Sequence, residues 1–433
     1  MLTMTDLFAG AGGSSTGAAS IPGVSVRYAA NHWKRAVDVH NANHPHVDHI
    51  CADISQYNPR RLRPTDILWA SPECTNHSVA KGVRRADGQP DLFEEILPDE
   101  AAERSRATMW DVPRFAEAHA YRAVIVENVV DAAKWAPFGA WLSAMHSIGY
   151  QHSTVYLNSM HASAGGPAAP QSRDRMYVVF HRRGERTPDL VAMQRPLAWC
   201  ASCSTDVHAI QSWKRPDHPW GRYRAQYVYR CPNVSCRNSV VEPYWRPASS
   251  AIDLSVPGTR IGDRTRPLAD KTRSRIAKGI ARYWNGPSVM EHRNVGLAVP
   301  VEGRDGKEAR PTSEPLRTQT TRLETALVYP EPFIAELRGG GSTARPVSQP
   351  MATVTAAGNH HGLVTVGDLE TAALQVDDCL FRMLEPSEVA AGMAFPSDYA
   401  WDGTRRERVR MAGNAVTPPA ARDLVAAVAE VLR

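Results

Sequence analysis

Short apolar runs alternate with helix-like segments through residues 1–182. The strand-like runs are 24–30, 67–70, 124–126 and 176–180, and helical spacing covers 13–20, 34–43 and 136–147. This alternation predicts an α/β fold with a parallel, doubly wound, Rossmann-like sheet, because each crossover helix packs on one face of the sheet. Ligands of such sheets bind beyond the carboxyl ends of the strands. The residues that directly follow the strand-like runs are therefore the candidates for chemistry.

The pattern changes at residue 183. Proline, arginine and tryptophan become frequent and the periodicity fades, which predicts a separate, irregular lobe over 183–345. Helical spacing returns at 384–393 and at 420–432, and the last segment follows two prolines that favour a helix start. We therefore expect three parts: 1–182, 183–345 and 346–433.

The composition is that of a water-soluble chain of 433 residues, long enough for one large and one smaller domain. Its hydrophobic content of 43% is too low for a membrane protein. The start of the chain lacks a basic region before an apolar one, so we expect no signal peptide and a cytoplasmic location.

Positive charge is concentrated in one run, although the net charge is only +5. Between residues 260 and 282 eight basic residues accompany two acidic ones: Arg260, Arg264, Arg266, Lys271, Arg273, Arg275, Lys278 and Arg282 against Asp263 and Asp270. Such a run is usually a solvated helix face, and in a protein that holds a polyanion it favours phosphate contact.

Two cysteine pairs lie within the irregular lobe. Cys200 and Cys203 are followed, after a polar and aromatic stretch, by Cys231 and Cys236. This spacing is typical of a structural zinc ribbon with four thiolate ligands, and a metal would stabilise a module too polar to form its own core. The alternative, four free thiols in a reducing cytosol, leaves the paired spacing unexplained.

Three loops carry the candidate chemistry. A glycine-rich turn spans residues 8–13, Cys74 follows the run 67–70, and Glu127 follows the run 124–126. A thiol and a carboxylic acid at neighbouring strand ends can add a nucleophile to an electron-poor ring. A glycine turn alone could equally hold a dinucleotide, and the thiol–acid pair decides against that interpretation.

The order of these motifs resembles the DNA (cytosine-5) methyltransferases. The resemblance rests on five segments at both ends of the chain: Asp6–Gly13 as the S-adenosylmethionine loop, Cys74 with Ser78, Glu127-Asn128-Val129, Gln171-Ser172-Arg173-Asp174-Arg175, and Gly413-Asn414-Ala415-Val416. It implies that 183–345 is the target-recognition region and that 346–433 returns to the catalytic domain. Each short motif is weak alone, and five in the family's order are strong.

The resemblance also implies roles for single residues. Cys74 would add to C6 of cytosine and Glu127 would act at N3, while one of Arg173 and Arg175 contacts the base or a phosphate and the other braces the loop. The cofactor, S-adenosylmethionine, would be held by Phe8, Ala9, Gly10, Gly12, Gly13, Asn31, His32, Trp33, Asp53, Ile54, Pro72, Asn414 and Val416. Within the lobe, we expect the aromatic and basic stretch 213–224 to read flanking bases.

Two positions depart from the family's pattern. Glu73 precedes Cys74 where the family usually has proline, and His32 stands where the family usually has an acidic residue for the ribose. A carboxylate beside the thiol would by itself disfavour the thiolate. Glu73 either pairs with a basic group or tunes the reaction differently. Asn76 and His77 also differ from the family's more usual residues, so the target base could be an altered cytosine.

The implied substrate is double-stranded DNA, methylated by a monomeric bacterial or phage enzyme, alone or beside a restriction nuclease. An RNA cytosine methyltransferase is the nearest alternative. A non-catalytic DNA-binding regulator that keeps the cofactor pocket is a second, and a nicotinamide oxidoreductase is a distant third.

Overall fold

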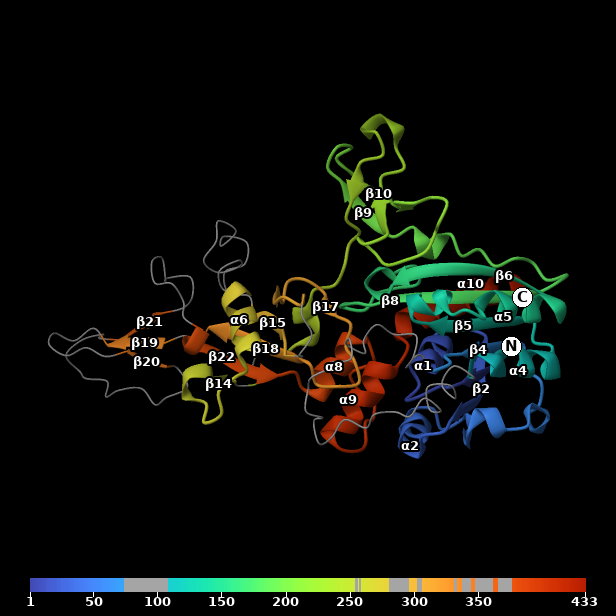
Figure 1. Ribbon diagram of the computed structural model, residues 1–433, viewed down its shortest axis with the longest axis horizontal. Helices are drawn as coiled ribbons and strands as arrows, with labels where there is room; N and C mark the ends of the chain where they lie inside the picture. The colour runs from blue at the N-terminus through green and yellow to red at the C-terminus, as the bar shows by residue number, and fades with distance from the viewer. Residues whose placement is uncertain are drawn as a thin grey trace. The chain divides into compact units, whose positions relative to one another are not determined.

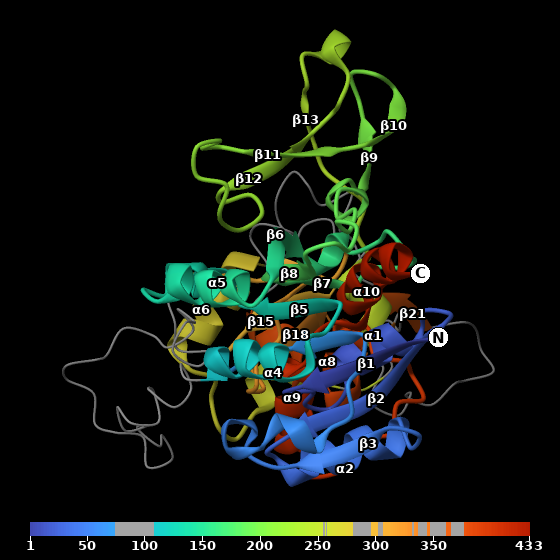
Figure 2. The ribbon, with the colours of Figure 1, turned by 90° about the vertical axis from the view of Figure 1, so that its right-hand side faces the viewer.

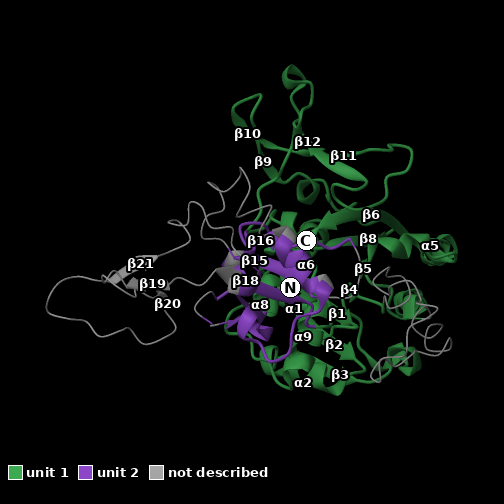
Figure 3. Cartoon of the chain, turned by 60° about the vertical axis from the view of Figure 1, so that its left-hand side comes forward, with its two compact units in different colours: residues 1–246, 317–322, 389–433 green, residues 247–316, 323–388 purple. Residues whose placement is uncertain are grey.

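The computed structural model describes residues 1–73, 108–253, 256, 258–279, 296–301, 306–330, 333–336, 344–346, 361–364 and 376–433. Cys74 and Ser78 lie outside these residues. The chain forms two compact units, the first from residues 1–246, 317–322 and 389–433 and the second from 247–316 and 323–388 (Figure 3). The boundaries expected after residues 182 and 345 stay a prediction.

A seven-stranded sheet forms the centre of the first unit (Figure 1). Its order is β3-β2-β1-β4-β5-β8-β6, and the first five strands are parallel. The strands are β1 (Leu2–Leu7), β2 (Val24–Asn31), β3 (Asp48–Cys51), β4 (Ile67–Ala70), β5 (Ala123–Asn128), β6 (Tyr150–Asn158) and β8 (Asp174–Arg182). The expected α/β fold with a large parallel sheet is confirmed.

The sheet is mixed at one edge, where β8 runs antiparallel to both β5 and β6. The prediction that the run 176–180 joins a parallel sheet is therefore wrong. Residues 159–173 connect β6 to β8 through a 3₁₀ turn and the two-residue strand β7 (Gln171–Ser172), without an α-helix. A parallel pairing needs a long crossover connection, so this link returns the chain antiparallel.

Helices cover both faces of the sheet (Figure 2). On one face α1 (Gly13–Ala19) and α10 (Pro418–Leu432) enclose a core that includes Leu424 and Val428. On the other face α4 (Asp111–His119) and α5 (Phe138–Ser147) bury Phe115 and Trp141. The remaining described helices are α2 (Lys34–Asn43) and α9 (Arg405–Asn414) in this unit, α6 (Asp270–Gly279) in the second, and α8 (Pro386–Gly392), whose residues are divided between the two.

The first unit also carries the four paired cysteines, on short antiparallel strands. They are β9 (Leu197–Cys200), β10 (Thr205–His208), β11 (Ile210–Trp213), β12 (Tyr227–Arg230) and β13 (Val240–Val241). We call residues 197–245 the cysteine module. Its small core contains Tyr227 and Tyr229 and also Met160 from the main sheet's side.

The second unit is built on a five-stranded antiparallel sheet that the sequence pattern did not predict. Its strands are β14 (Thr259–Arg260), β22 (Cys379–Met383), β18 (Thr325–Pro330), β15 (Leu297–Pro300) and β16 (Arg310–Pro311), and β19 (Phe333–Glu336), β20 (Ala344–Pro346) and β21 (His361–Val364) form another sheet. Among the described residues of both units, no helix is long and apolar enough to cross a membrane.

Candidate active site

The glycine turn opens at the carboxyl edge of the central sheet. It leaves β1 at Leu7 and enters α1 at Gly13, and Phe8, Gly10 and Gly12 all have positive φ angles, of 60°, 55° and 100°. A Cβ atom built on Gly10 would meet no atom within 4 Å. The turn therefore combines a left-handed backbone with open space beside it, which suits close approach of a ligand to the main chain.

Gly13 has a different reason to be glycine. A Cβ atom there would lie 2.0 Å from the main-chain oxygen of Val416, and one on Gly17 would lie 2.4 Å from that of Pro418. These glycines let the segment before α10 pack directly on α1. Val416 thereby reaches the glycine turn, as a buried residue, while the neighbouring Asn414 is exposed.

A buried polar chain lies beneath the turn, and sequence reasoning missed it. Asp6 Oδ2 accepts hydrogen bonds from the hydroxyls of Ser14 and Ser15 at 2.6 and 2.7 Å. The Ser15 hydroxyl also lies 2.9 Å from His40 Nε2, and His40 Nδ1 lies 2.8 Å from His49 Nε2. Burial raises the pKa of Asp6 to about 7 and lowers the pKa of His40 to about 2. The clustered histidines and the two serines after the glycines were the available signal.

The ends of β2 and β3 hold the other expected cofactor residues. Asn31 Oδ1 accepts from the Trp33 amide at 2.9 Å, and Asp53 Oδ1 accepts from the Ser55 amide at 3.0 Å. Asp53 borders an open cavity of about 460 Å³. Its lining residues are Ala52, Asp53, Gln56, Tyr57, Asn58 and Arg61. Ile54 is buried in the core of the α4–α5 face.

The two departures from the family's pattern meet in space. His32 Nδ1, at the end of β2, lies 3.7 Å from Glu73 Oε1, beyond the end of β4. Both side chains are partly exposed, at 57% and 40%. Glu73 thus has a basic partner, one of the two arrangements that its position beside Cys74 left open.

Glu127 ends β5 and is nearly buried against an arginine. Its Oε1 lies 2.7 Å from Arg175 Nε, and the two side chains are only 11% and 13% exposed. The antiparallel ladder between β5 and β8 pairs Glu127 with Tyr177 and Asn128 with Met176, so that Arg175, the next residue along β8, lies near the end of β5. Arg175 thereby fixes the direction of the carboxylate.

Asn128 ties the acid loop to the strand end that leads into Cys74. Its Nδ2 donates to the Pro72 carbonyl at 3.3 Å, and its Oδ1 accepts from the Val129 amide at 2.8 Å. On the other side of Pro72, the Glu73 amide donates to Thr108 Oγ1 at 3.2 Å. Hydrogen bonds at the Pro72 carbonyl and at the Glu73 amide thus hold the last described residues before Cys74 in place.

A family model described as C-5 cytosine-specific DNA methylase matches residues 2–196. Residues 2–196 thus carry a domain of this family. The Type II methyltransferase M.HgiDI of Herpetosiphon aurantiacus is 27% identical to this methylase over 316 residues, which span 68% of this chain and 89% of that protein. The family uses S-adenosylmethionine to methylate cytosine at C5, and the protein is a DNA cytosine methyltransferase.

Solved structures share the fold of the methylase. The crystal structure of the Dnmt2 methyltransferase of S. pombe matches it with a TM-score of 0.52 at 14% sequence identity, and the match covers 100% of both chains. At this identity the likeness concerns the fold alone.

Arg173 of the methylase is buried and donates hydrogen bonds to three main-chain carbonyls. Its Nη1 donates to the Gln319 carbonyl at 3.0 Å, and its Nη2 donates to the Gly413 and Ala415 carbonyls, both at 3.1 Å. The side chain is 3% exposed. Of the two arginines expected at the site, Arg173 braces the backbone that carries Asn414 and Val416, and Arg175 holds Glu127.

Replacing Arg173 by alanine should lower the free energy of unfolding by on the order of 3 kcal/mol or more, because it leaves three buried carbonyl oxygens without their donor. Chemical denaturation followed by circular dichroism measures this change. Arg183→Ala is the control, since that exposed guanidinium makes one long hydrogen bond of 3.4 Å to the His146 carbonyl. A loss at Arg173 no larger than at Arg183 would contradict the fastening role.

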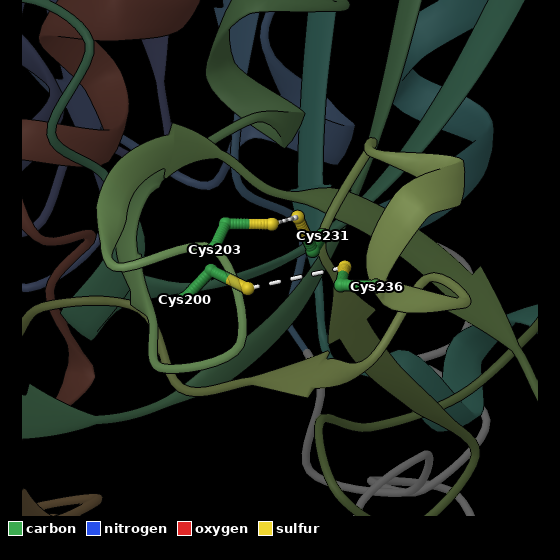
Figure 4. Close-up of side chains that lie close together, drawn as sticks. All are labelled: Cys200, Cys203, Cys231 and Cys236. Atoms are coloured by element: carbon green, nitrogen blue, oxygen red, sulfur yellow. Dashed lines mark hydrogen bonds between the residues drawn. The ribbon is translucent and has the colours of Figure 1, made fainter.

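The four paired cysteines converge in the cysteine module (Figure 4). All four sulfur atoms lie within 4.8 Å of one another, and the Cys200–Cys236 and Cys203–Cys231 sulfurs are each 3.9 Å apart. These separations are far longer than a disulfide bond of about 2.05 Å. The arrangement suits one metal ion held by four thiolates.

Much of the stretch expected to read DNA packs inside the first unit. Trp213 lies edge-on to Tyr156, with ring centroids 5.6 Å apart, and Trp220 Nε1 donates to the Val130 carbonyl at 2.9 Å. Tyr223 is 7% exposed. These three side chains therefore have partners within the unit, and base reading by the stretch 213–224 stays a prediction.

The basic run of the second unit is partly neutralised by the protein. Arg273 forms a bidentate ion pair with Asp377, with distances of 2.7 Å from Nη1 to Oδ1 and 3.1 Å from Nη2 to Oδ2. The buried Arg275 donates to the Pro300 carbonyl at 2.8 Å. Arg264 lies over the Phe381 ring. For these three residues the run has structural partners, so phosphate contact does not account for their positions.

Proposed function

We propose that the methylase transfers a methyl group to C5 of a flipped-out cytosine in double-stranded DNA, through a covalent bond between Cys74 and C6 of the base. The Glu127–Arg175 pair is the observation that carries this proposal. The pair holds the Glu127 carboxyl group at one edge of the sheet. The glycine turn and the end of β4, which leads to Cys74, lie at the same edge. Addition to a pyrimidine ring requires a nucleophile and an acid, the roles proposed for Cys74 and Glu127.

The chemistry assigned to the protein's own residues is nucleophilic and acid–base. The Cys74 thiolate would form a bond to C6, which makes C5 nucleophilic. Once C5 has bonded to the methyl group, its proton would leave to solvent water, and the bond between C6 and Cys74 would break and restore the ring and the thiolate. Glu127 would face N3 and the exocyclic amine and stabilise the adduct by hydrogen bonding or proton donation at N3. S-adenosylmethionine supplies an electrophilic methyl group when bound. The open space beside Gly10 leaves room for such a ligand at the turn.

The contact between His32 and Glu73 bears on the charge beside the Cys74 thiol. When protonated, His32 would offset the Glu73 carboxylate, which would then oppose thiolate formation at Cys74 less than an unpaired carboxylate does. This pairing supports plain cytosine chemistry, and an altered target base is not needed to account for Glu73.

Double-stranded DNA is the proposed substrate, because the family is a DNA methylase family. C5 and C6 are stacked in the duplex, so the enzyme has to flip its target base. The relative named as a Type II methyltransferase supports a place beside a restriction nuclease. We also propose that Cys200, Cys203, Cys231 and Cys236 bind a structural zinc ion. A tetrahedral site with Zn–S bonds of about 2.3 Å places its sulfurs about 3.8 Å apart, close to the observed 3.9 Å.

Nucleoside mass spectrometry tests the reaction. The protein is incubated with methyl-labelled S-adenosylmethionine and either mixed-sequence duplex DNA or transfer and ribosomal RNA, with Cys74→Ala alongside. We expect label in 5-methylcytosine of the DNA and none with Cys74→Ala, because the variant lacks the nucleophile. Label in RNA alone would replace the substrate, and label in another nucleoside would replace the proposed target. Full activity of Cys74→Ala would exclude the covalent route.

A further inference from the structure

Residues 220–223 of the cysteine module contact two neighbouring parts of the sheet edge, the loop after β5 and the start of β8. Trp220 Nε1 donates to the Val130 carbonyl at 2.9 Å, and the Arg222 guanidinium forms an ion pair with Asp131. Val130 and Asp131 directly follow the segment Glu127–Val129. This contact lies on the loop that leaves the proposed acid.

The same residues also hold the strand that carries the partner of Glu127. The Tyr223 amide donates to Asp174 Oδ1 at 3.0 Å, and Asp174 is the residue before Arg175. The Tyr223 ring packs edge-on against His161, with ring centroids 4.7 Å apart. One short segment therefore contacts residues close in sequence to both members of the Glu127–Arg175 pair: Val130 and Asp131 after Glu127, and Asp174 before Arg175.

The acidic partners of the segment are sheltered from water, whereas the Arg222 side chain is 37% exposed. Asp131 has a side-chain exposure of 9%, and Lys134 lies 3.5 Å from it and 4.0 Å from the centre of the Trp220 ring. Burial raises the pKa of Asp174 to about 6. Charged groups would not be enclosed here without partners, so the segment is fixed in place rather than resting on the surface.

The local sequence shapes this segment. Gly221 has a φ angle of 139°, and a Cβ atom there would lie 2.3 Å from Gln226 Cβ. Gln226 Oε1 accepts from the Arg222 amide at 2.8 Å. β12 then runs from Tyr227 to Arg230 and delivers Cys231 to the cysteine cluster. Seven residues, 224–230, thus join the segment 220–223 to Cys231 of the cluster.

We propose that residues 220–223, which the cysteine module carries, position the Glu127–Arg175 pair for catalysis, with Trp220 and Arg222 as positioning residues. This inference rests on the proposed function, in which Glu127 acts at N3 of the base. A base-reading role for the same residues predicts a different result, because side chains that read bases change the affinity for DNA.

The test separates the rate of reaction from binding. Single-turnover rates at saturating duplex DNA and S-adenosylmethionine, and the Kd values for both, are measured for Trp220→Phe, Arg222→Gln, Arg222→Lys and Asp131→Asn. Arg237→Gln is the matched control, since it removes one exposed charge from the same module. Zinc content and thermal unfolding show whether each variant is folded.

We expect Arg222→Gln to lower the single-turnover rate about tenfold or more, as small displacements of catalytic groups do, with both Kd values unchanged. Arg222→Lys should recover part of the rate, and Arg222→Gln combined with Asp131→Asn should be no slower than Arg222→Gln alone. Arg237→Gln should match the wild type. A weaker DNA Kd with an unchanged rate would assign the segment to base reading and overturn the inference. An unchanged rate and Kd in an active enzyme would overturn it too, whereas a wild-type chain that methylates nothing would overturn the proposed function as well.

Discussion

Replacing Glu127 by glutamine should lower the single-turnover rate of methyl transfer about 10²–10⁴-fold, the usual contribution of a positioned acid or base. Glutamine keeps the size of the side chain and removes both the charge and the transferable proton. It also leaves the nearly buried Arg175 without its anionic partner, now 2.7 Å away. Rapid-quench measurements with labelled S-adenosylmethionine and duplex DNA give the rate.

The control for this loss is Glu185→Gln. Glu185 forms a similar pair with Arg122, at 2.6 Å, but follows the other end of β8. Its replacement removes a glutamate–arginine pair without touching the proposed site, so the rate should stay within about twofold of the wild type by the small cost of surface pairs. Equal rates for Glu127→Gln and the wild type would remove Glu127 from the mechanism.

The parallel part of the sheet was predictable because its strands are buried on both faces. Runs such as 67–70 and 124–126 read as continuous apolar segments, which is typical of parallel strands covered by helices. Strand direction is a different matter. The apolar run inside β8 looks the same whether the strand is parallel or antiparallel, and only the connection between β6 and β8 decides it.

The site could be located from sequence, but its pairings could not. Glu127 and Arg175 were both expected there, and the antiparallel register that joins them is a property of the folded sheet. Likewise, no spacing distinguishes Arg173, which fastens three carbonyls, from Arg175, two residues on. His32 and Glu73 stood out as separate departures, and only the fold brings them within 3.7 Å of each other.

The glycines show the limit of assigning residues by motif. Gly10 lies beside open space, as a ligand-binding turn requires, whereas the space beside Gly13 is filled by the backbone of Val416. Both belong to one motif, and the reason for the second lies some 400 residues away in the chain. The cysteines behave differently, since their spacing predicted four converging thiols and the structure brings the sulfurs together.

Removing the metal should unfold the cysteine module while leaving the central sheet intact. The core of the module is small, and structural zinc contributes about 10–16 kcal/mol of binding free energy in comparable small domains. Cys231→Ser deletes a fully buried ligand with little change of size. We expect about one zinc per wild-type chain, against little or none in the variant.

Hydrogen exchange shows where the structure is lost. In Cys231→Ser, or after treatment with a strong chelator, amides of β11, β12 and β13 should exchange rapidly, while those of β1, β4 and β5 stay protected, because the parallel strands have their own core. Cys51→Ser is the matched control, as Cys51 is exposed on β3 and outside the cluster. Zinc retained at one per chain in Cys231→Ser, or protection retained in β12 without metal, would show that packing against the sheet alone holds the module. If the module unfolds as expected, the contacts of Trp220 and Arg222 are lost with it, and methyl transfer should fall together with the zinc content.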